Sequence, residues 1–319
     1  MTSQAATGSL IVVTPVYEDV EASSRLFVEL AASLGRQVIV VAVDDGSVRN
    51  PVDPDSIARA GLDGVVIRLR RNVGHQRAIA IGLSYIADNH AGAGRVVVMD
   101  SDGEDVPASI PLLLQPLESE IVDVVVARRS SRVETIRFRA FYVFYKCLFQ
   151  LLTGRSISFG NFMALKPGAA SRLVAMQELW IHVAGCVLTS KLRIEARSLD
   201  RGPRYAGQSK MNFVGLALHG FKALMVFAED VLVRVGVACT LIAALSIIGG
   251  ATAIMLKLIG FATPGWFSVA LGILFLVFLQ TGALTLMTLM LTGVVRGGSV
   301  ASLSYKEFID SVTLVQNRI

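Results

Sequence analysis

Two aspartates, Asp100 and Asp102, stand two residues apart directly after the strand-like run 95–99. Carboxylates at this spacing can share a hard divalent cation such as Mg²⁺ or Mn²⁺, which keeps open positions for the oxygens of a diphosphate. The alternative is a solvated acidic turn, because an Asp-x-Asp pair is common on its own. The place of the pair at the end of a predicted buried strand favours the metal site.

Polar residues also follow the other strand-like runs. Pro15, Tyr17 and Asp19 lie at the end of the first run, and Asp44 and Asp45 end the second. Asp44 and Asp45 could hydrogen-bond a base or a ribose, but Asp-Gly is also a frequent turn pair, so both interpretations stay open. The sequence contains neither a G-x-G-x-x-G after the first strand nor a G-x-x-x-x-G-K-[ST], which excludes the common dinucleotide and P-loop cradles.

The elements that would position these residues alternate between strand and helix patterns. Strands are predicted at 10–14, 37–43, 65–69, 95–99 and 122–127, and helices at 21–34 and 75–88. Apolar strands that alternate with helices predict an α/β fold with a mostly parallel sheet covered on both faces. Ligands bind such sheets at the C-terminal ends of the strands, where the polar residues fall.

Hydrophobic residues are concentrated near the C-terminus. The 319 residues are 53% hydrophobic and 17% charged, with a mean hydropathy of +0.59, whereas soluble chains carry about a quarter charged residues. No charge occurs over 235–256 or over 258–295. These stretches predict membrane helices near Val235–Leu256 and Trp266–Leu291. The alternative is a buried helical hairpin in a soluble protein. The net charge of +5 is too small to indicate a nucleic-acid partner.

These patterns predict a division of the chain. Residues 1–211 form a cytoplasmic catalytic domain, 212–234 an interfacial amphipathic helix, 235–295 two transmembrane helices and 296–319 a cytoplasmic tail. The first nine residues have no apolar core, so a signal peptide is not predicted and both termini are expected in the cytoplasm. The helix within 212–234 could equally pack on the catalytic domain.

In this order, the motifs resemble family 2 glycosyltransferases with a GT-A fold. The similarity is greatest to polyprenyl-phosphate glycosyltransferases, such as dolichyl-phosphate mannose synthase and the bactoprenol glycosyltransferases. It covers about Leu10–Leu291. It rests on Pro15-x-Tyr17, Asp44-Asp45-Gly46-Ser47, Asn72-x-Gly74 with Ala78 and Gly82, Asp100-x-Asp102, Arg128, and Arg204-x-x-Gly207-x-Ser209-Lys210.

The resemblance implies a role for each matched residue. It implies that Pro15, Tyr17, Asp19, Asp44 and Asp45 contact the nucleotide, and that Asp100 and Asp102 bind the metal (Mg²⁺ or Mn²⁺). The catalytic set is Asp100, Asp102, Arg128, Arg204 and Lys210, and the acceptor phosphate falls to Arg204, Ser209 and Lys210. A solvated basic loop is the alternative for Arg204 and Lys210.

The resemblance also implies an activity. A sugar passes, with inversion, from a UDP- or GDP-linked nucleotide sugar to a polyprenyl phosphate, expected to be undecaprenyl phosphate. The enzyme would be a multi-pass protein of the inner (plasma) membrane that acts at its cytoplasmic face. A homo-oligomer is left open, and no nucleic-acid partner is expected.

Several residues depart from the family pattern. The family usually has Asn-Glu at Glu18-Asp19 and often has Gln at Glu104, and the stretch 158–163 lacks an expected Asp and Arg. The departures leave room for a non-catalytic nucleotide-binding membrane scaffold, and a two-span transport subunit is a third hypothesis. The segment 177–180 lacks the Gln-x-x-Arg-Trp of processive synthases, which disfavours a processive polymerase. The four histidines show no metal-ligand spacing and are expected to be structural or exposed.

Overall fold

The structure is a computed structural model that describes residues 8–90, 92–129, 136–205, 213–261, 265–297 and 304–317. The chain divides into two compact units. The first takes in the described residues of 1–135, 157–226 and 301–319, and the second those of 136–156 and 227–300. The first unit is therefore interrupted twice by the second along the sequence.

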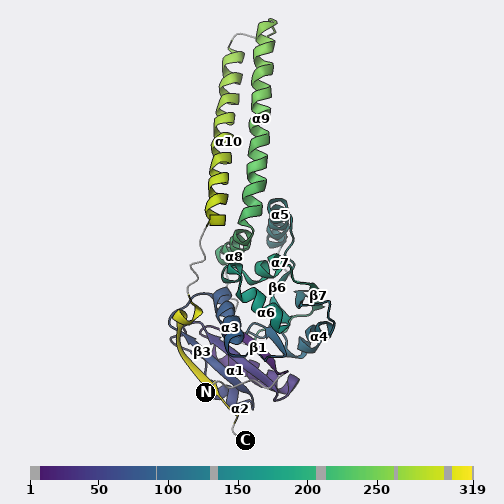
Figure 1. Ribbon diagram of the computed structural model, residues 1–319, viewed down its shortest axis with the longest axis vertical. Coiled ribbons are helices and arrows are strands. Elements are labelled where there is room, and N and C mark those ends of the chain that lie inside the picture. The colour runs from purple at the N-terminus through teal and green to yellow at the C-terminus, as the bar shows by residue number, and fades with distance from the viewer. Residues whose placement is uncertain are drawn as a thin grey trace. The chain divides into compact units, whose positions relative to one another are not determined.

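An eight-stranded sheet forms the centre of the first unit (Figure 1). Its strands are β1 Leu10–Val16, β2 Val38–Asp44, β3 Asp63–Leu69, β4 Arg95–Val98, β5 Val124–Arg129, β6 Phe159–Leu165, β7 Ile194–Leu199 and β8 Ile309–Val315. Their order is β7-β5-β6-β4-β1-β2-β3-β8. In this sheet only β6 and β8 run against the other strands. The mostly parallel sheet is confirmed, and all five predicted strands are present.

Strand β8 was not expected from the sequence. It lies in the stretch predicted as a cytoplasmic tail, yet it pairs antiparallel with β3 from Gly64↔Val315 to Leu69↔Ile309. The adjoining turn η4 (Tyr305–Phe308) is held to the end of α3, where Asp88 accepts a hydrogen bond from Tyr305 and contacts Lys306. The segment after the apolar helices is thus part of the sheet of the first unit.

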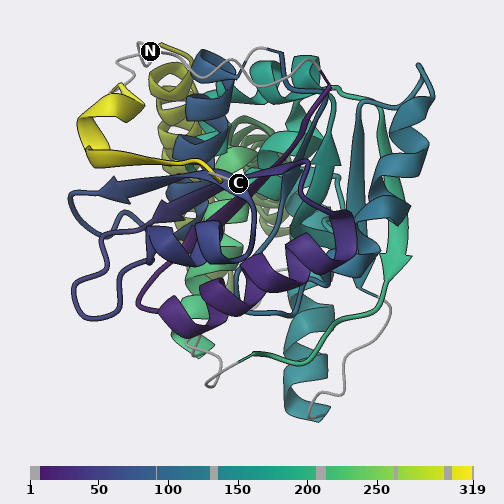
Figure 2. The same ribbon diagram turned by 90° about the horizontal axis from the view of Figure 1, so that it is seen from below.

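Helices cover both faces of this sheet (Figure 2). The first unit contains α1 Val20–Leu34, α2 Pro54–Arg59, α3 His75–Asn89, α4 Ile110–Leu114, α6 Pro167–Val174, α7 Val183–Thr189 and α8 Phe213–Val226, with the short 3₁₀ turns η1 Pro107–Ser109, η2 Gln115–Glu118 and η3 Gln177–Trp180. Successive strand residues alternate between two buried clusters, because side chains of a strand point to opposite faces. The predicted coverage of both faces is confirmed.

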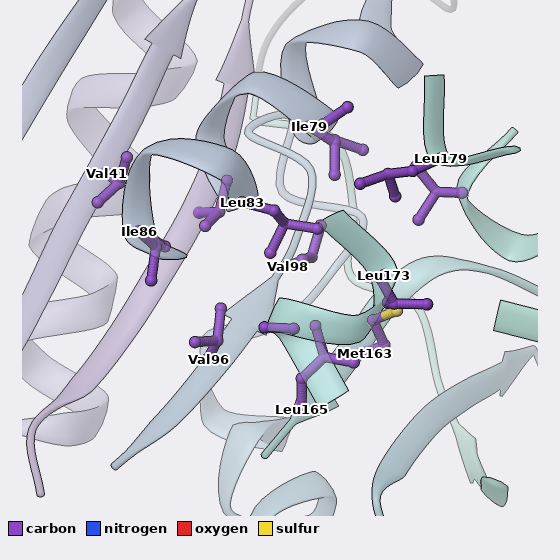
Figure 3. Packing of buried hydrophobic residues seen from close by; sticks show 14 of the residues in the cluster. Val41, Ile79, Leu83, Ile86, Val96, Val98, Met163, Leu165, Leu173 and Leu179 are labelled. Carbon is purple, nitrogen blue, oxygen red and sulfur yellow. The ribbon is translucent and has the colours of Figure 1, made fainter. Parts of the chain in front are cut away.

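The packing of α3 fixes the position of its first turn, which begins at His75. Ile79, Leu83 and Ile86 pack over Val96 and Val98 of β4 (Figure 3). Gly82 lets the helix approach closely, because a Cβ there would stand 2.6 Å from Val13 Cγ1. A larger side chain at this point would push α3 away from the sheet.

The second unit contains α5 Ile136–Thr153, α9 Ala228–Leu258 and α10 Trp266–Gly297. Two of its helices, over Ala228–Leu258 and Trp266–Leu291, are long and apolar enough to cross a membrane. Only 11% and 6% of their most apolar windows are buried, whereas a helical hairpin in a soluble core would be mostly buried. Gly249 of α9 lies against Leu274 of α10, so a small residue permits close helix packing there.

Candidate active site

An open pocket lies at the C-terminal ends of β4, β5 and β7 and at the first residues of β6. This is the edge at which ligands bind parallel sheets. Its polar lining comes from segments far apart in the sequence: Asp100, Glu104, Asp105, Arg128, Asn161, Asp200 and Arg201. Asp100 and Arg128, both predicted from the sequence, therefore meet at one pocket, together with residues that the sequence did not single out.

The acidic turn after β4 is held by its own residues. Asp105 Oδ2 accepts the backbone N–H of Asp100 at 2.9 Å, and Asp102 Oδ1 accepts that of Glu104 at 3.0 Å. Gly103 has φ +90°, a conformation that favours glycine, and a Cβ there would also meet the Tyr205 ring at 2.7 Å. The turn thus holds its carboxylates in place before any ligand arrives.

Two arginines form ion pairs with the carboxylates of this acidic turn. Arg204 donates from Nη2 to Asp102 Oδ2 (2.9 Å) and from Nε to Glu104 Oε1 (3.0 Å). Arg201 donates from Nη1 to Glu104 Oε2 at 2.6 Å. Arg204, expected at the acceptor phosphate, therefore lies on one of the two predicted metal ligands. Glu104, which departs from the family pattern, is the residue that binds both guanidiniums.

The pKa of Asp102 reflects this setting. Burial raises it above its ordinary value, and the nearby carboxylates of Asp100 and Glu104 act in the same direction. The backbone N–H of Glu104 and the Arg204 guanidinium oppose the rise. An extra positive charge at this turn would therefore be favourable.

The segment that carries the two arginines, residues 200–205, is fastened to the acidic turn through the backbone. Gly202 donates its N–H to Glu104 O at 3.1 Å, and Tyr205 donates its N–H to Asp102 O at 2.8 Å. The Tyr205 hydroxyl donates to Glu29 on α1, which together with burial raises the pKa of that phenol. The two guanidiniums are thus presented by a fixed backbone.

His75, which no sequence motif singled out, lies in the same site. It is the first residue of α3, and its Nε2 atom stands 3.2 Å from Asp100 Oδ1. Burial opposes the charged imidazole, yet Asp100, Asp105 and Asp102 raise its pKa above the ordinary value. Its position after β3, at the same sheet edge as the Asp100 turn, was the signal that could have found it.

A chain of side-chain amides reaches the same Nε2 atom of His75 that contacts Asp100. Gln76 Oε1 accepts the backbone N–H of Val183, the first residue of α7, at 2.6 Å. Gln76 Nε2 donates to Asn161 Oδ1 at 3.1 Å, and Asn161 Nδ2 stands 2.9 Å from His75 Nε2. The Val183 N–H fixes the orientation of the Gln76 amide, so that Gln76 Nε2 is the donor to Asn161 Oδ1. Asn161 lies in the stretch that departs from the family, so that departure falls in the pocket.

The predicted nucleotide-binding acids after β2 are engaged by backbone N–H groups. Asp44 accepts from Ser47 (2.8 Å) and Val52 (2.9 Å), one on each oxygen. Asp45 accepts from Val73 (2.7 Å) and Gly74 (3.0 Å), and burial raises its pKa. Both carboxylates thus organise loops at the strand ends.

Glu18 and Asp19 have similar structural roles. Glu18 accepts the backbone N–H groups of Val48, Arg49 and Asn50, which lower the pKa of its carboxyl. Asp19, expected at the nucleotide, caps α1 by accepting from Ala22 N–H at 3.4 Å. The Glu18-Asp19 departure from the family therefore has a structural explanation.

Of the remaining predicted residues, the structure describes Pro15, Tyr17 and Arg128. Pro15 is buried at the end of β1, whereas the Tyr17 side chain beside it is exposed. Arg128 is exposed and lines the pocket. Ser209 and Lys210, together with Gly207, lie outside the described residues.

A metal ion would find two predicted carboxylates in this site. The described residues contain no group of three His, Cys, Asp or Glu side chains that could hold a metal. Two carboxylates suit Mg²⁺ when diphosphate oxygens and water complete its shell, and the crowded acids that raise the Asp102 pKa favour a cation. The residues therefore fit such an ion if Asp102 releases the Arg204 guanidinium and binds the ion in its place.

Comparison with known proteins decides the family. The model of "Glycosyl transferase family 2" matches residues 11–172, just over half of the chain. The chain belongs to glycosyl transferase family 2. The matched region contains β1 to β6, the Asp100–Asp102 turn and Arg128, so the resemblance inferred from the motifs is confirmed.

Relatives in this family fall into two groups. An undecaprenyl-phosphate 4-deoxy-4-formamido-L-arabinose transferase of Edwardsiella ictaluri is 32% identical over 152 residues, 46% of this chain and 45% of the relative. The chain thus spans about half the length of the first curated relatives that it matches. An uncharacterized glycosyltransferase of Synechocystis is 26% identical over 282 residues, 84% of this chain and 85% of the relative.

Solved structures support the fold. Glucosyl-3-phosphoglycerate synthase from Mycobacterium tuberculosis, crystallised with Mn²⁺, uridine diphosphate and phosphoglyceric acid, aligns with a TM-score of 0.51. The alignment covers 71% of this chain and 78% of the synthase at 16% sequence identity. The predicted GT-A fold of the family 2 domain is confirmed.

Proposed function

We propose that this family 2 enzyme transfers a sugar from a nucleotide-sugar donor to a polyprenyl phosphate at the cytoplasmic face of a membrane. The observation that carries the proposal is the pocket lined by Asp100, Arg128 and Arg201, with Arg204 paired to Asp102 on the same acidic turn. Carboxylates that accept a divalent cation and guanidiniums that bind phosphate are the two groups such a transfer needs. The undecaprenyl-phosphate transferases among its relatives support this acceptor class.

The chemistry follows from the charges in the site. An oxygen of the lipid phosphate forms a bond to the anomeric carbon while the bond from that carbon to the diphosphate oxygen breaks, which inverts the configuration. A lipid phosphate is already anionic near neutral pH, so a strong general base is not required. A divalent cation held by Asp100 and Asp102 would neutralise charge on the leaving diphosphate. The arginines would position the phosphates.

The membrane arrangement is supported by connectivity. The chain leaves the first unit after α8 and re-enters it at η4 and β8, and β8 pairs with β3 of the catalytic sheet. This connectivity supports an arrangement in which both ends of the apolar segment lie on one side of a membrane, as an even number of crossings would leave them. The two helices α9 and α10 satisfy this as a hairpin, with the catalytic domain and both flanking segments in the cytoplasm.

Helix α8 supports access from the lipid phase. Leu218, Phe221 and Met225 are 56%, 63% and 60% exposed and fall on one face of the helix, whereas Gly220 and Ala223 are buried. The two sequence-based interpretations of this helix are thus compatible: one face packs on the domain, and the other is exposed and largely apolar, with Lys222 among its residues. Such a face suits the membrane interface, where a polyprenyl phosphate presents its head group.

Transfer can be tested directly on membranes that contain the full chain. Radiolabelled UDP- and GDP-sugars are supplied with undecaprenyl phosphate, with and without EDTA, and lipid-soluble label is counted. We expect one donor to label the lipid in a metal-dependent manner. The same assay is run on D102N, which removes one of the two predicted metal ligands. D123N is its matched control, because Asp123 pairs with Arg193 outside the pocket. The proposal fails if the wild-type protein labels no lipid with any donor.

One observation favours a second candidate, the non-catalytic nucleotide-binding scaffold. Arg204 and Arg201 already engage Asp102 and Glu104, so the chain itself supplies the positive charge that a metal would bring. In that case nucleotide binding would be measurable by calorimetry while no donor gave a lipid-linked product. Any lipid-linked sugar would rule the scaffold out.

A further inference from the structure

Arg201 is held in the pocket by two separate anchors. Its neighbour Gly202 approaches the acidic turn so closely that a Cβ would stand 2.5 Å from Gly103 O, and the Gly202 N–H binds Glu104 O. The Arg201 guanidinium is itself held through Nη1, 2.6 Å from Glu104 Oε2. Both the backbone and one end of the side chain are therefore fixed before any ligand arrives.

The other side of this guanidinium is unsatisfied. Arg201 Nε is buried and has no hydrogen-bond acceptor within the described part of the chain. Buried donors are nearly always paired in folded proteins. Because the Arg201 side chain lines the pocket, a ligand bound there is the nearest source of the acceptor that Nε lacks. Arg204 offers the contrast, since its Nε is taken up by Glu104.

The lining of the pocket indicates what kind of acceptor fits. Arg128 lines the same pocket, so two arginine side chains border it. Planar guanidiniums bind phosphate oxygens better than they bind neutral groups. The acidic residues of the lining would repel a phosphate on their own. The two arginines and the divalent cation of the proposed function offset that repulsion.

We propose that Arg201 is a substrate-binding residue whose Nε–H donates to a phosphoryl oxygen in this pocket. The inference deepens the proposed function and rests on it for the identity of the substrates. The oxygen comes from the nucleotide diphosphate of the donor or from the phosphate of the lipid acceptor. Glu104 is the positioning residue that keeps the guanidinium in place.

The test is R201K in the full chain, because lysine keeps the positive charge for Glu104 and loses the Nε donor. R197K is the matched control: Arg197 lies on the adjoining strand β7 and pairs with Glu195 in solvent. Loss of a charge-assisted hydrogen bond predicts about a 10- to 100-fold fall in kcat/KM for R201K. R197K should stay within about twofold of the wild type. Thermal unfolding of both variants and of R201Q tests whether the site is intact.

The two sources of phosphate are separated by titrating each substrate. A rise in KM for the nucleotide sugar, with weaker binding of UDP or GDP alone in calorimetry, assigns the oxygen to the donor. A rise confined to the KM for undecaprenyl phosphate assigns it to the acceptor. An R201K enzyme with wild-type constants for both substrates overturns the assignment, and so does an effect on sugar choice without any change in phosphate binding.

Failure of the proposed function gives a different pattern. If the wild-type protein transfers no sugar but binds UDP or GDP, R201K should still weaken that binding, and equal binding overturns the inference alone. If the wild type binds neither nucleotide nor polyprenyl phosphate, both proposals are overturned. R201Q, which has lost the charge as well, should bind no better than R201K.

Discussion

The carboxylates after β2 and those after β4 stand at the same edge of one sheet, yet different partners hold them. Asp44 and Asp45 accept hydrogen bonds from backbone N–H groups, which cannot leave without unfolding a loop. Glu104 accepts from the side chains of Arg201 and Arg204, and Asp102 accepts from Arg204 on one oxygen and from the Glu104 backbone N–H on the other. The arginine side chains can swing to another anion. An acidic residue at a strand end is thus structural when the backbone binds it and exchangeable when a side chain does.

The largest expected effect comes from the exchangeable group. D102N removes the charge that binds Arg204 and, in the proposed function, the metal. Its transfer rate should fall by about 100-fold or more, because charge stabilisation in the transition state is lost. Its thermal unfolding should stay close to that of D123N. If D102N transferred sugar at the normal rate, Asp102 would be structural like Asp44 and Asp45, and the difference between the two groups of carboxylates would disappear.

The structural group should show the reverse pattern. D44N leaves one backbone N–H of the β2 loop facing an amide N–H₂ instead of a carboxylate oxygen. The free energy of unfolding should fall by roughly 1–3 kcal/mol, since a buried donor loses its acceptor. Urea denaturation in detergent measures the loss, and transfer per folded molecule should change by less than about tenfold. A larger loss of activity with unchanged stability would move Asp44 to the substrate-binding group.

The amide chain through Gln76 and Asn161 is intermediate between the two groups, because one of its ends is backbone and the other reaches Asp100. Q76L removes the acceptor for Val183 N–H and the donor to Asn161. We expect kcat/KM for the donor to fall by about tenfold, as His75 and Asn161 lose their fixed positions. Kinetics at saturating acceptor check this. An unchanged value would limit the chain to supporting α7.

The smallest effect concerns pH. The backbone N–H groups of Val48 and Asn50 lower the pKa of Glu18 from its ordinary value of 4.5. A lowered carboxyl pKa contributes stability that is present above pH 4.5 and is lost as the pH falls through the folded value. The melting temperature of E18Q should therefore lie below that of the wild type near neutral pH, and the gap should close in acid. A gap that widened in acid would contradict the assignment.

The sequence predicted those features that periodicity and spacing encode. The five strands, the helices α1 and α3 and the Asp100-x-Asp102 turn follow from apolar runs and the residues that end them. Arg201 and His75 were missed because their place in the site comes from tertiary packing: a glycine contact brings in the 200–205 segment, and α3 packing brings in His75. Strand β8 was missed because an edge strand carries no fully buried apolar run, as its exposed Val312 and Leu314 show.

Strand β8 has a consequence for how this protein is made. Because β8 follows α9 and α10 in the sequence, the ribosome delivers both apolar helices before the sheet can gain its eighth strand. Completion of the catalytic domain therefore comes after the helical hairpin has been synthesised. A version without the hairpin should be built by excision, with a linker joining α8 to η4, since truncation after α8 would also discard β8.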